Sequence, residues 1–348
     1  MRVIIPLSLG ILLLTLLLPL LLIPSPVRQE PAGELEPEQD LESEAALLPY
    51  MLERSPGAGH LDDGIILRVL VGDEVMELTM AAYLRGVVAA EMPARFHPEA
   101  LKAQAVAART YTLHRMLVSP TARHPEAYVC GSYACCKAYH NEEERRARWG
   151  ESYEHYSQII ANAISATDGL ILFYENLPIL AAFHSSSYGF TEASGAIWGD
   201  LPYLQSVRSF EGAQEVPNYY SSVVLTFSEF REIATAALPA ANLPEDNILH
   251  WITDISYTDS GRLASLKIGG VALTGAEFRK LFSLRSTAVR FSFDEEGVTI
   301  QTGGFGHGVG MSQFGANTMA GLGLGFEAIL DWYYTNVSLD SVERLFSP

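Results

Sequence analysis

The chain lacks the features on which several common classes of protein depend. Basic residues are few, since Lys and Arg total 23 against 41 Asp and Glu, which gives a net charge of −18. Binding to nucleic acid needs basic patches that neutralise phosphates, so this balance argues against it. Three cysteines are too few for a disulfide scaffold. No P-loop motif and no dinucleotide-binding glycine motif occurs, which argues against both kinds of nucleotide enzyme.

What the chain does contain is enough apolar sequence for a folded core. Hydrophobic residues make up 48% of its 348 residues and charged residues 18%, so the chain as a whole is not disordered. This length allows one large domain or two small ones. We expect an acidic, flexible linker at residues 27–63, because residues 30–44 contain Glu and Asp but no Lys or Arg, and like charges extend a chain. A partner-binding acidic tail is the alternative. The folded domain is then predicted at residues 64–340.

The N-terminus carries a long uncharged segment. Residues 3–24 contain no charged side chain, and as a helix they reach about 33 Å, enough to cross a bilayer core. A cleaved signal peptide is the alternative, but the apolar run is longer than usual and residues 23–26 (IPSP) are not a typical cleavage site. We therefore predict one transmembrane anchor at residues 1–26, in the cell membrane, with the folded domain outside the cytoplasm.

A glutamate lies near the end of the first predicted helix. Residues 80–91 have apolar side chains at helical spacing, and Pro93 cannot continue a helix. Glu91 thus falls on the last turn or just past it, where the partial negative charge of the helix C-terminus favours a protonated carboxyl group. A protonated carboxyl group at neutral pH is what a general acid requires. On this argument alone, a solvated surface glutamate is the simpler interpretation.

The next predicted helix runs from Pro98 to about Leu117, because Pro and Glu are typical of a first helical turn. Its Lys102 and Arg109 are seven residues apart and share one side of the helix. They are either solvated charges or the positive wall of a cleft. Beyond it, a hairpin is predicted from residues 170–174 and 179–183, with its turn at Glu175 and Asn176. Residues 211–300 are predicted to form strands with a short helix at 274–281.

All three cysteines of the chain lie in one short segment. Together with a nearby histidine they form a set of soft ligands, which Zn²⁺ prefers in tetrahedral sites: His124, Cys130, Cys135 and Cys136. A disulfide between Cys130 and Cys136 is the rival interpretation in an oxidising compartment, as are plain buried cysteines. Four protein ligands would close the site and make the metal structural, whereas an open fourth position would favour a zinc hydrolase.

Residues 83–111 (YLRGVVAAEMPARFHPEALKAQAVAARTY) resemble the signature of the SpoIID/LytB family of bacterial cell-wall proteins. Residues 183–207, 307–316 and 326–334 also resemble the family, in the same order, although Tyr188 replaces a glycine of the family pattern. The resemblance covers about residues 64–337. The metal-binding members are similar at His124, Cys130 and Cys136, with Cys135 where a histidine is expected. That departure puts Cys135 in doubt as a ligand and leaves His140 in reserve.

The resemblance implies that Glu91 is the catalytic residue of a peptidoglycan lytic transglycosylase, a carbon–oxygen lyase. Such an enzyme cleaves the bond between N-acetylmuramic acid and N-acetylglucosamine in glycan strands and leaves 1,6-anhydro ends. Members of the sporulation type are implied to act on strands stripped of stem peptides during engulfment. They are implied to work with a cell-wall amidase/endopeptidase of the stage II sporulation protein P type. The alternative is a non-catalytic, glycan-binding enhancer of a cell-wall amidase.

We expect an α+β fold, in which a helical portion carrying Glu91 packs on mainly antiparallel sheets and is preceded by one transmembrane helix. Hydroxyl and aromatic side chains suit a sugar, although core and turn packing explains many of them equally well. The predicted glycan-binding residues are Lys102, Arg109, Ser185, Ser186, Ser187, Tyr203, His307, Ser312 and Gln313. The last three belong to a glycine-rich motif at residues 303–320, where glycine lets another chain approach closely.

Overall fold

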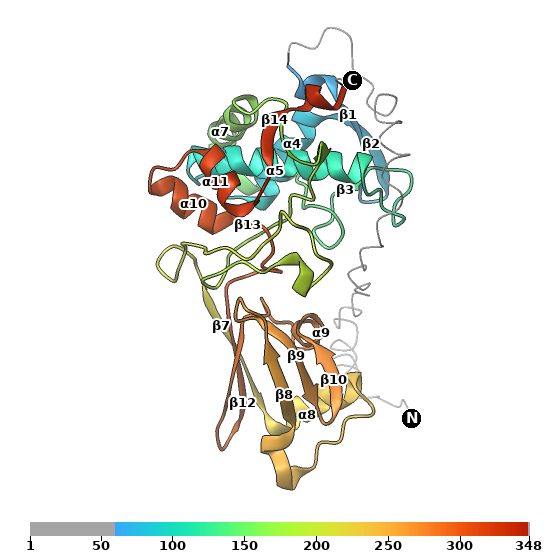
Figure 1. Cartoon of the computed structure of the whole chain (residues 1–348), viewed down its shortest axis with the longest axis vertical. Helices are drawn as coiled ribbons and strands as arrows, with labels where there is room; N and C mark the ends of the chain where they lie inside the picture. Colours follow the sequence, from blue (N-terminus) through green and yellow to red (C-terminus); the bar gives the residue numbers. More distant parts are fainter. Residues whose placement is uncertain (1–59, 347–348) are drawn as a thin grey trace, which may run out of the picture. The chain divides into compact units, whose positions relative to one another are not determined.

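The computed structural model describes residues 60–346 (Figure 1). The predicted transmembrane segment, residues 1–26, and nearly all of the predicted linker lie outside the described residues. Within residues 60–346, no helix combines the length and the apolar character needed to cross a bilayer. The described part mixes helices with mainly antiparallel sheets, as the predicted α+β class requires.

The helices and strands have the following bounds. The α-helices are α4 (Met80–Glu91), α5 (Pro98–Leu117), α6 (Glu142–Trp149), α7 (Tyr153–Ser165), α8 (Phe227–Ala237), α9 (Gly275–Leu281), α10 (Gln313–Gly321) and α11 (Phe326–Tyr333). The strands are β1 (Ile66–Val71), β2 (Glu74–Thr79), β3 (Val129–Cys130), β4 (Leu170–Tyr174), β5 (Leu177–Pro178), β6 (Phe183–His184), β7 (Tyr220–Thr226), β8 (Ile252–Tyr257), β9 (Leu263–Ile268), β10 (Val271–Thr274), β11 (Val289–Phe293), β12 (Gly297–Gly303), β13 (Met311–Ser312) and β14 (Ser338–Ser341). Short 3-10 turns include η3 (Asp62–Gly64) and η6 (Glu245–His250).

Helix α5 is the centre of the first hydrophobic core. It contacts α4, α7, α10 and α11, which surround it in Figure 1, and it also packs on β4. Its small side chains explain this position, because alanines at 100, 103, 105, 107 and 108 are all fully buried and let neighbouring elements approach closely. Almost the whole helix is therefore buried, although its sequence is not strongly apolar.

The ends of α4 and α5 are fixed by local sequence. The Thr79 side chain accepts a hydrogen bond from the Ala82 backbone amide and caps the start of α4. Pro93 follows shortly after and stops α4 at Glu91. Pro98 then occupies the first turn of α5, where its missing amide costs nothing. The predicted bounds of both helices are confirmed.

Three small sheets flank these helices. β1 pairs with β2 in an antiparallel hairpin and with β3 in parallel, while β14 joins β4 and β5. The turn of the predicted hairpin lies at Glu175 and Asn176, both of which have positive φ. Its second strand, however, is β5 (Leu177–Pro178) and not the predicted residues 179–183. β6 does not pair with β4. It pairs in parallel with β13 instead, which brings residues 183–184 beside residues 311–312.

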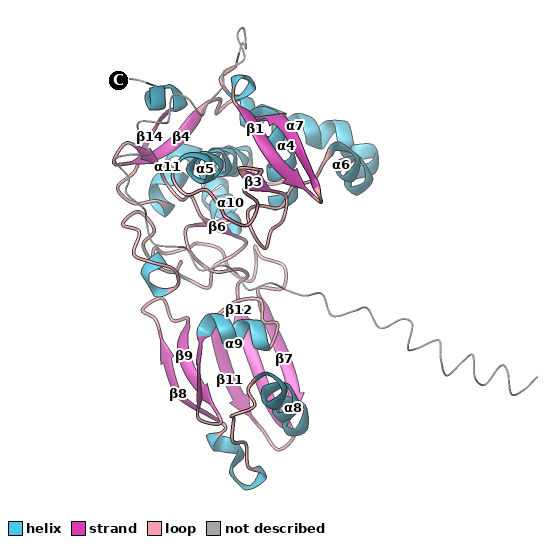
Figure 2. Cartoon of the chain, turned by 90° about the vertical axis from the view of Figure 1, so that its right-hand side faces the viewer, coloured by secondary structure: helices cyan, strands magenta, loops and turns pink. Residues whose placement is uncertain are grey.

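A second hydrophobic core lies between two antiparallel sheets, β8–β9–β10 and β7–β12–β11, and helices α8 and α9. Figure 2 shows both helices against one side of these strands. Glutamate capping boxes begin each helix, at Thr226 with Glu229 and at Thr274 with Glu277. Residues 211–300, which the sequence described only as strands and a short helix, thus supply a core of their own.

The folded region begins before Gly64, where the sequence placed its boundary. The Leu61 amide donates to a carboxylate oxygen of Asp168 over 2.7 Å. The Asp62 side chain is 1% exposed and pairs with Arg109 in the middle of α5. The acidic character of this stretch had suggested linker, but one of its aspartates is a buried ion-pair partner.

Candidate functional site

Glu91 is the last residue of α4 and is half-buried. Its Oε1 accepts a hydrogen bond from the Ala138 backbone amide over 3.0 Å. Its Oε2 accepts one from Gln313 Nε2 over 3.4 Å. Two neutral donors from distant parts of the chain therefore hold the carboxylate and leave one side of it open to solvent.

Gln313 links the glutamate motif to the glycine-rich motif. It is the first residue of α10, it is buried, and its Nε2 also lies 3.5 Å from Gln104 Oε1 on α5. The preceding Ser312 caps α10, because its Oγ accepts from the Gly315 amide. The cap fixes the direction in which Gln313 leaves the backbone. The structure thus brings Gln313 to Glu91, as expected for members of one site.

The segment that supplies Ala138 is clamped against α4. Gly86 lies where a Cβ atom would meet the Tyr139 ring at 2.2 Å, so only glycine allows this approach. The Gly86 carbonyl accepts from the His140 amide over 3.2 Å, and the Tyr139 ring stacks on Tyr83 with centroids 5.8 Å apart. The contact fixes Ala138 in place and so fixes the donor to Glu91.

Just before this clamp, the predicted metal ligands lie together. One ligand atom from each of His124, Cys130, Cys135 and Cys136 lies within 4.8 Å of the others. The three thiols are free, and Cys135 joins the group in spite of its departure from the family pattern. A tetrahedral zinc with sulfur ligands spaces them about 3.8 Å apart, close to the 4.0 Å between the sulfurs of Cys135 and Cys136.

The histidine of this cluster is already oriented for a metal. The Ala127 carbonyl can only accept, so His124 Nδ1 donates to it over 2.9 Å. The Nε2 lone pair then faces Cys136 Sγ at 3.3 Å. A hydrogen bond from Cys136 lowers the pKa of the Cys130 thiol to about 5, and the same pairing raises that of Cys136. Ionisation of one thiol opposes ionisation of the other, so a bound cation is needed for all three to ionise. Zn²⁺ is a cation that thiolates bind.

His140 is not part of this cluster. Its Nδ1 lies 3.4 Å from Arg148 Nη1. Among the described residues, the possible metal ligands do not include His140.

Lys137 is a residue of the site that the sequence reasoning missed. It stands between the last cysteine and Ala138, and it is 8% exposed. Its Nζ lies 3.6 Å from the centre of the Phe183 ring and 4.2 Å from that of Tyr111. Burial lowers its pKa to about 8, while the negative charge of Glu91 acts in the opposite direction. Its position beside the metal motif was the one signal in the sequence.

The serine motif, which we define as His184 to Ser187, is a mostly buried support of the site. His184 Nδ1 donates to the Val309 carbonyl, so its Nε2 accepts from the Ser187 hydroxyl at 2.6 Å. Ser186 is buried, and its hydroxyl has no hydrogen-bond partner among the described residues. The Ser185 carbonyl accepts from the Phe314 amide on α10. This bond connects the serine motif to α10. Of the three serines, only Ser185 is half-exposed.

Glu211 is a second residue that the sequence did not single out. Its buried carboxylate accepts from the Ser187 amide over 2.6 Å and from the hydroxyls of Ser312 and Ser209. Because all these donors are neutral and close, Glu211 holds the serine and glycine motifs in register. Nothing in its local sequence marks it, since its partners come from distant segments.

His307 lies on the loop between β12 and β13. Its ring is 5.6 Å from that of His184 and 5.0 Å from that of Trp198, and its Nδ1 accepts from the Val309 amide. Gly308 beside it has a φ of 90°, and a Cβ there would meet the Arg262 guanidinium at 2.5 Å. Arg262 thus reaches from the β8–β9 turn to the glycine motif, where it is fully buried.

Three predicted glycan-binding residues have other partners. Arg109 has no exposed side-chain surface and forms a two-pronged ion pair with Asp62 at 2.6 and 2.7 Å, so its placement is structural. Lys102 pairs with Glu99 at 2.7 Å and lies against the Phe326 ring. Tyr203 is buried, and its hydroxyl accepts from the Leu180 amide. The wall of positive charge expected on α5 does not form.

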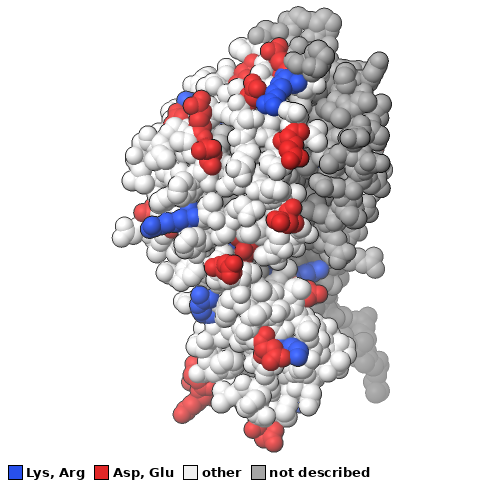
Figure 3. Space-filling model, in the orientation of Figure 1, with Lys and Arg blue, Asp and Glu red and all other residues white. Residues whose placement is uncertain are grey.

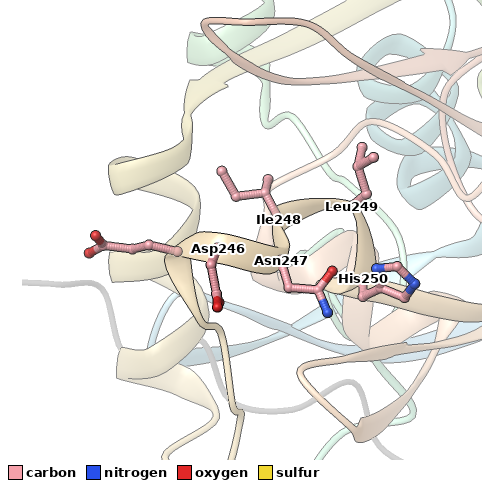
Figure 4. A pocket seen from close by; sticks show the side chains of 6 residues that line it. Asp246, Asn247, Ile248, Leu249 and His250 are labelled. Carbon is pink, nitrogen blue, oxygen red and sulfur yellow. The ribbon is translucent and has the colours of Figure 1, made fainter.

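The surface around these elements carries scattered charge. Figure 3 shows acidic and basic side chains dispersed over one face, without a continuous basic patch. A shallow pocket follows η6 and contains none of the predicted site residues (Figure 4). A second hollow is lined in part by Glu192, Gln205 and Thr258, and Glu192 there accepts from the Thr258 and Ser260 hydroxyls.

Comparison with known proteins finds relatives of this chain. The family described as "Stage II sporulation protein" (SpoIID) matches residues 72–174, which contain Glu91 and the cysteine cluster. Stage II sporulation protein D of Bacillus subtilis (strain 168) is 35% identical over 274 residues, 78% of each chain. That of Bacillus amyloliquefaciens is also 35% identical, over 78% of this chain and 77% of its own. The amidase enhancer of Bacillus subtilis is 28% identical over 74% of this chain and 40% of the enhancer. By the 35% identity to the two sporulation proteins, over most of both chains, the protein belongs to the stage II sporulation protein D family.

Proposed function

We propose that this protein is a peptidoglycan lytic transglycosylase that cleaves glycan strands during sporulation, with Glu91 as its acid and base. The observation that supports this most is the placement of Glu91. A half-buried carboxylate lies where the glutamate, metal and glycine motifs meet, and neutral donors hold both of its oxygens.

A single carboxylate suffices for this reaction. Ordinary glycosidases use a second carboxylate for a water or a covalent intermediate. Among the described residues, the buried Glu211 and Glu192 have their oxygens occupied by amide and hydroxyl donors. They are supports rather than nucleophiles. A reaction that needs no second carboxylate therefore fits this chain better than ordinary hydrolysis.

In the proposed mechanism, Glu91 gives its proton to the oxygen between N-acetylmuramic acid and N-acetylglucosamine, and the bond to C1 breaks. The carboxylate then takes the proton of the C6 hydroxyl, whose oxygen bonds to C1 and closes the 1,6-anhydro ring. The entropic cost is small because the attacking hydroxyl belongs to the same sugar. Ala138 N–H and Gln313 Nε2 keep the carboxylate facing the bond throughout.

We propose Zn²⁺ as the ion of the cysteine cluster, held by His124, Cys130, Cys135 and Cys136. Four protein ligands leave no position for a water, so the ion would crosslink the chain rather than activate a nucleophile. The crosslinked segment leads directly into Lys137 and Ala138. A zinc at this place would therefore stabilise the donor that holds Glu91.

The proposed location and partners of the protein follow from the proposed activity. We propose that residues 1–26 anchor the protein in the cell membrane with residues 64–340 outside the cytoplasm, where peptidoglycan lies. Strands without stem peptides are the proposed substrate, supplied by a cell-wall amidase/endopeptidase of the stage II sporulation protein P type. The relatives named for sporulation support this setting.

The test is the product of the full chain on purified glycan strands freed of stem peptides. We expect 1,6-anhydro ends by mass spectrometry, and a loss of about 100-fold or more in rate for Glu91→Gln, which cannot give a proton. Glu232→Gln is the matched control, because Glu232 is exposed on α8. Reducing ends without anhydro products would show ordinary hydrolysis and overturn the proposal.

One relative favours a second candidate function. The amidase enhancer shares 28% identity with this chain, so a glycan-binding enhancer is the alternative. In that case the folded, zinc-loaded chain would release no product, and it would raise the rate of an added amidase equally with Glu91 or Gln at position 91. The two candidate functions thus predict opposite results for the unchanged chain and Glu91→Gln.

A further inference from the structure

Lys137 is a buried cation without an anionic partner. Its side chain lies between the rings of Phe183 and Tyr111, and among the described residues its Nζ has neither a hydrogen-bond acceptor nor an ion-pair partner. Ring faces offset only part of the cost of removing an ammonium group from water. An acceptor from outside the chain would complete its coordination.

The position of Lys137 limits what that acceptor is. The adjacent residue, Ala138, donates its amide to Glu91, so Lys137 lies in the segment that contacts the proposed acid. Among the described residues no ion pair joins the ammonium to the Glu91 carboxylate, although the negative charge of Glu91 acts on it. Phe183, which covers Lys137, directly precedes the serine motif. The ammonium therefore lies among the segments that carry the donor to Glu91 and the serine motif.

We propose that Lys137 binds the lactyl carboxylate of N-acetylmuramic acid and thereby selects strands whose stem peptides have been removed. This inference rests on the proposed function. In an intact strand that carboxyl group is an amide with the first amino acid of the peptide and carries no charge. Once the peptide has been cut away at this bond, the group is a free carboxylate. The charge is thus the chemical difference between the two substrates.

The geometry of the sugar fits this assignment. The lactyl group is attached at C3, two ring carbons from the C1 that takes part in the reaction. A group that binds it must lie near the acid but apart from it, as Lys137 does. The substrate carboxylate would otherwise approach Glu91, a like charge, and a nearby cation offsets that repulsion. A neutral side chain at this position would not distinguish the two kinds of strand.

The experiment compares two substrates that differ in this charge alone. Peptide-free glycan strands are used as the free acid and after conversion of the lactyl carboxyl groups to the methylamide. We expect kcat/KM of the full chain to be at least about tenfold higher on the acid. Lys137→Met keeps the apolar stem and removes the charge, so the preference should vanish. Lys137→Arg should restore part of it, and Lys280→Met, a change at an exposed lysine of α9, should leave it intact.

A structural role for Lys137 would give a different pattern. Loss of packing in Lys137→Met would lower the rate on both substrates equally and leave their ratio unchanged, which would overturn the proposal. An unchanged preference in a folded Lys137→Met variant would do the same.

The proposed function and this inference fail separately. Binding of short acid and methylamide saccharides to Glu91→Gln, with and without Lys137→Met, requires no catalysis. If no variant cuts glycan but Glu91→Gln still prefers the acid and the double variant does not, the lyase proposal fails and the role of Lys137 stands. If anhydro products form but neither binding nor rate depends on the charge at Lys137, the inference fails alone.

Discussion

Lys102 and Arg109 show how differently two charged residues of similar appearance in the sequence are used. Arg109 lies seven positions from Lys102 on α5, and both were predicted to face a cleft. Lys102 remains near the surface, whereas Arg109 points into the core and meets the carboxylate of Asp62. Helical spacing places residues on one side of a helix, but it does not show whether that side faces solvent or another element.

A buried ion pair predicts a specific pattern of stability. Asp62→Asn or Arg109→Met leaves the other charge buried, so we expect each to lower the free energy of unfolding by about 3–5 kcal/mol. The double variant should lose less than the sum of the two. Urea unfolding of the chain and its three variants measures this. Additive losses would show that the two groups do not act as a pair, and activity per folded molecule should change little.

At the scale of the element, close contacts decide where the site lies. Helix α4 and the segment around Tyr139 touch because Gly86 has no side chain. The sequence predicted the bounds of α4 correctly from its apolar spacing and from Pro93. It did not predict the contact, because a glycine within a helix has several explanations and its partner is far along the chain.

Gly86→Ala should therefore destabilise the protein, although alanine favours helices. The added Cβ would meet the Tyr139 ring, and we expect a loss of about 1–3 kcal/mol together with a lower rate of glycan cleavage. Gly321→Ala on α10 is the matched control, because its Cβ would meet open space. That change should be neutral or stabilise the fold by up to about 1 kcal/mol. Equal effects of the two changes would contradict the clamp.

Removal of the metal acts on the same segment. We expect about one zinc per chain by elemental analysis and a fall in the melting temperature when a strong chelator is added. Activity should fall with it, because the donor Ala138 follows the cluster directly. Added zinc should restore both properties, whereas Mg²⁺ should not, since thiolates prefer softer ions. A chain that keeps its melting temperature without metal would count against the zinc proposal.

At the scale of the whole molecule, buried neutral histidines couple stability to pH. Burial lowers the pKa of His114 to about 4 and that of His184 well below its ordinary value. The unfolded chain binds protons at these residues below about pH 6.5, whereas the folded chain does not. Stability is thus fully present above about pH 6.5 and is lost as the pH falls toward 4.

This dependence can be measured by urea unfolding between about pH 7 and pH 5. Each histidine contributes a slope of up to about 1.4 kcal/mol per pH unit in that range. His114→Gln, whose amide can still donate to the Pro178 carbonyl, should show a smaller slope than the unchanged chain. An identical slope would show that His114 titrates alike in both states.

The sequence predicted individual elements better than the way they meet. The α+β class, helices α4 and α5 and the cluster of His and Cys side chains that could hold a metal followed from spacing, proline and cysteine. The partners of Glu91, the placement of Lys137 and the buried Glu211 did not, because each depends on segments far apart in the chain. Hydroxyls at Ser186 and Ser187 were expected at a sugar, and they lie instead among buried supports.

Glu91 and Gln313 are 222 residues apart along the chain. During synthesis, a ribosome releases the segment containing Glu91 long before it has made α10 and the glycine motif. A nascent chain therefore carries the acid without the side chain that holds its second oxygen. If Glu91 acts as proposed, the cleavage activity would be acquired late in translation, and a chain truncated before residue 313 would lack this contact.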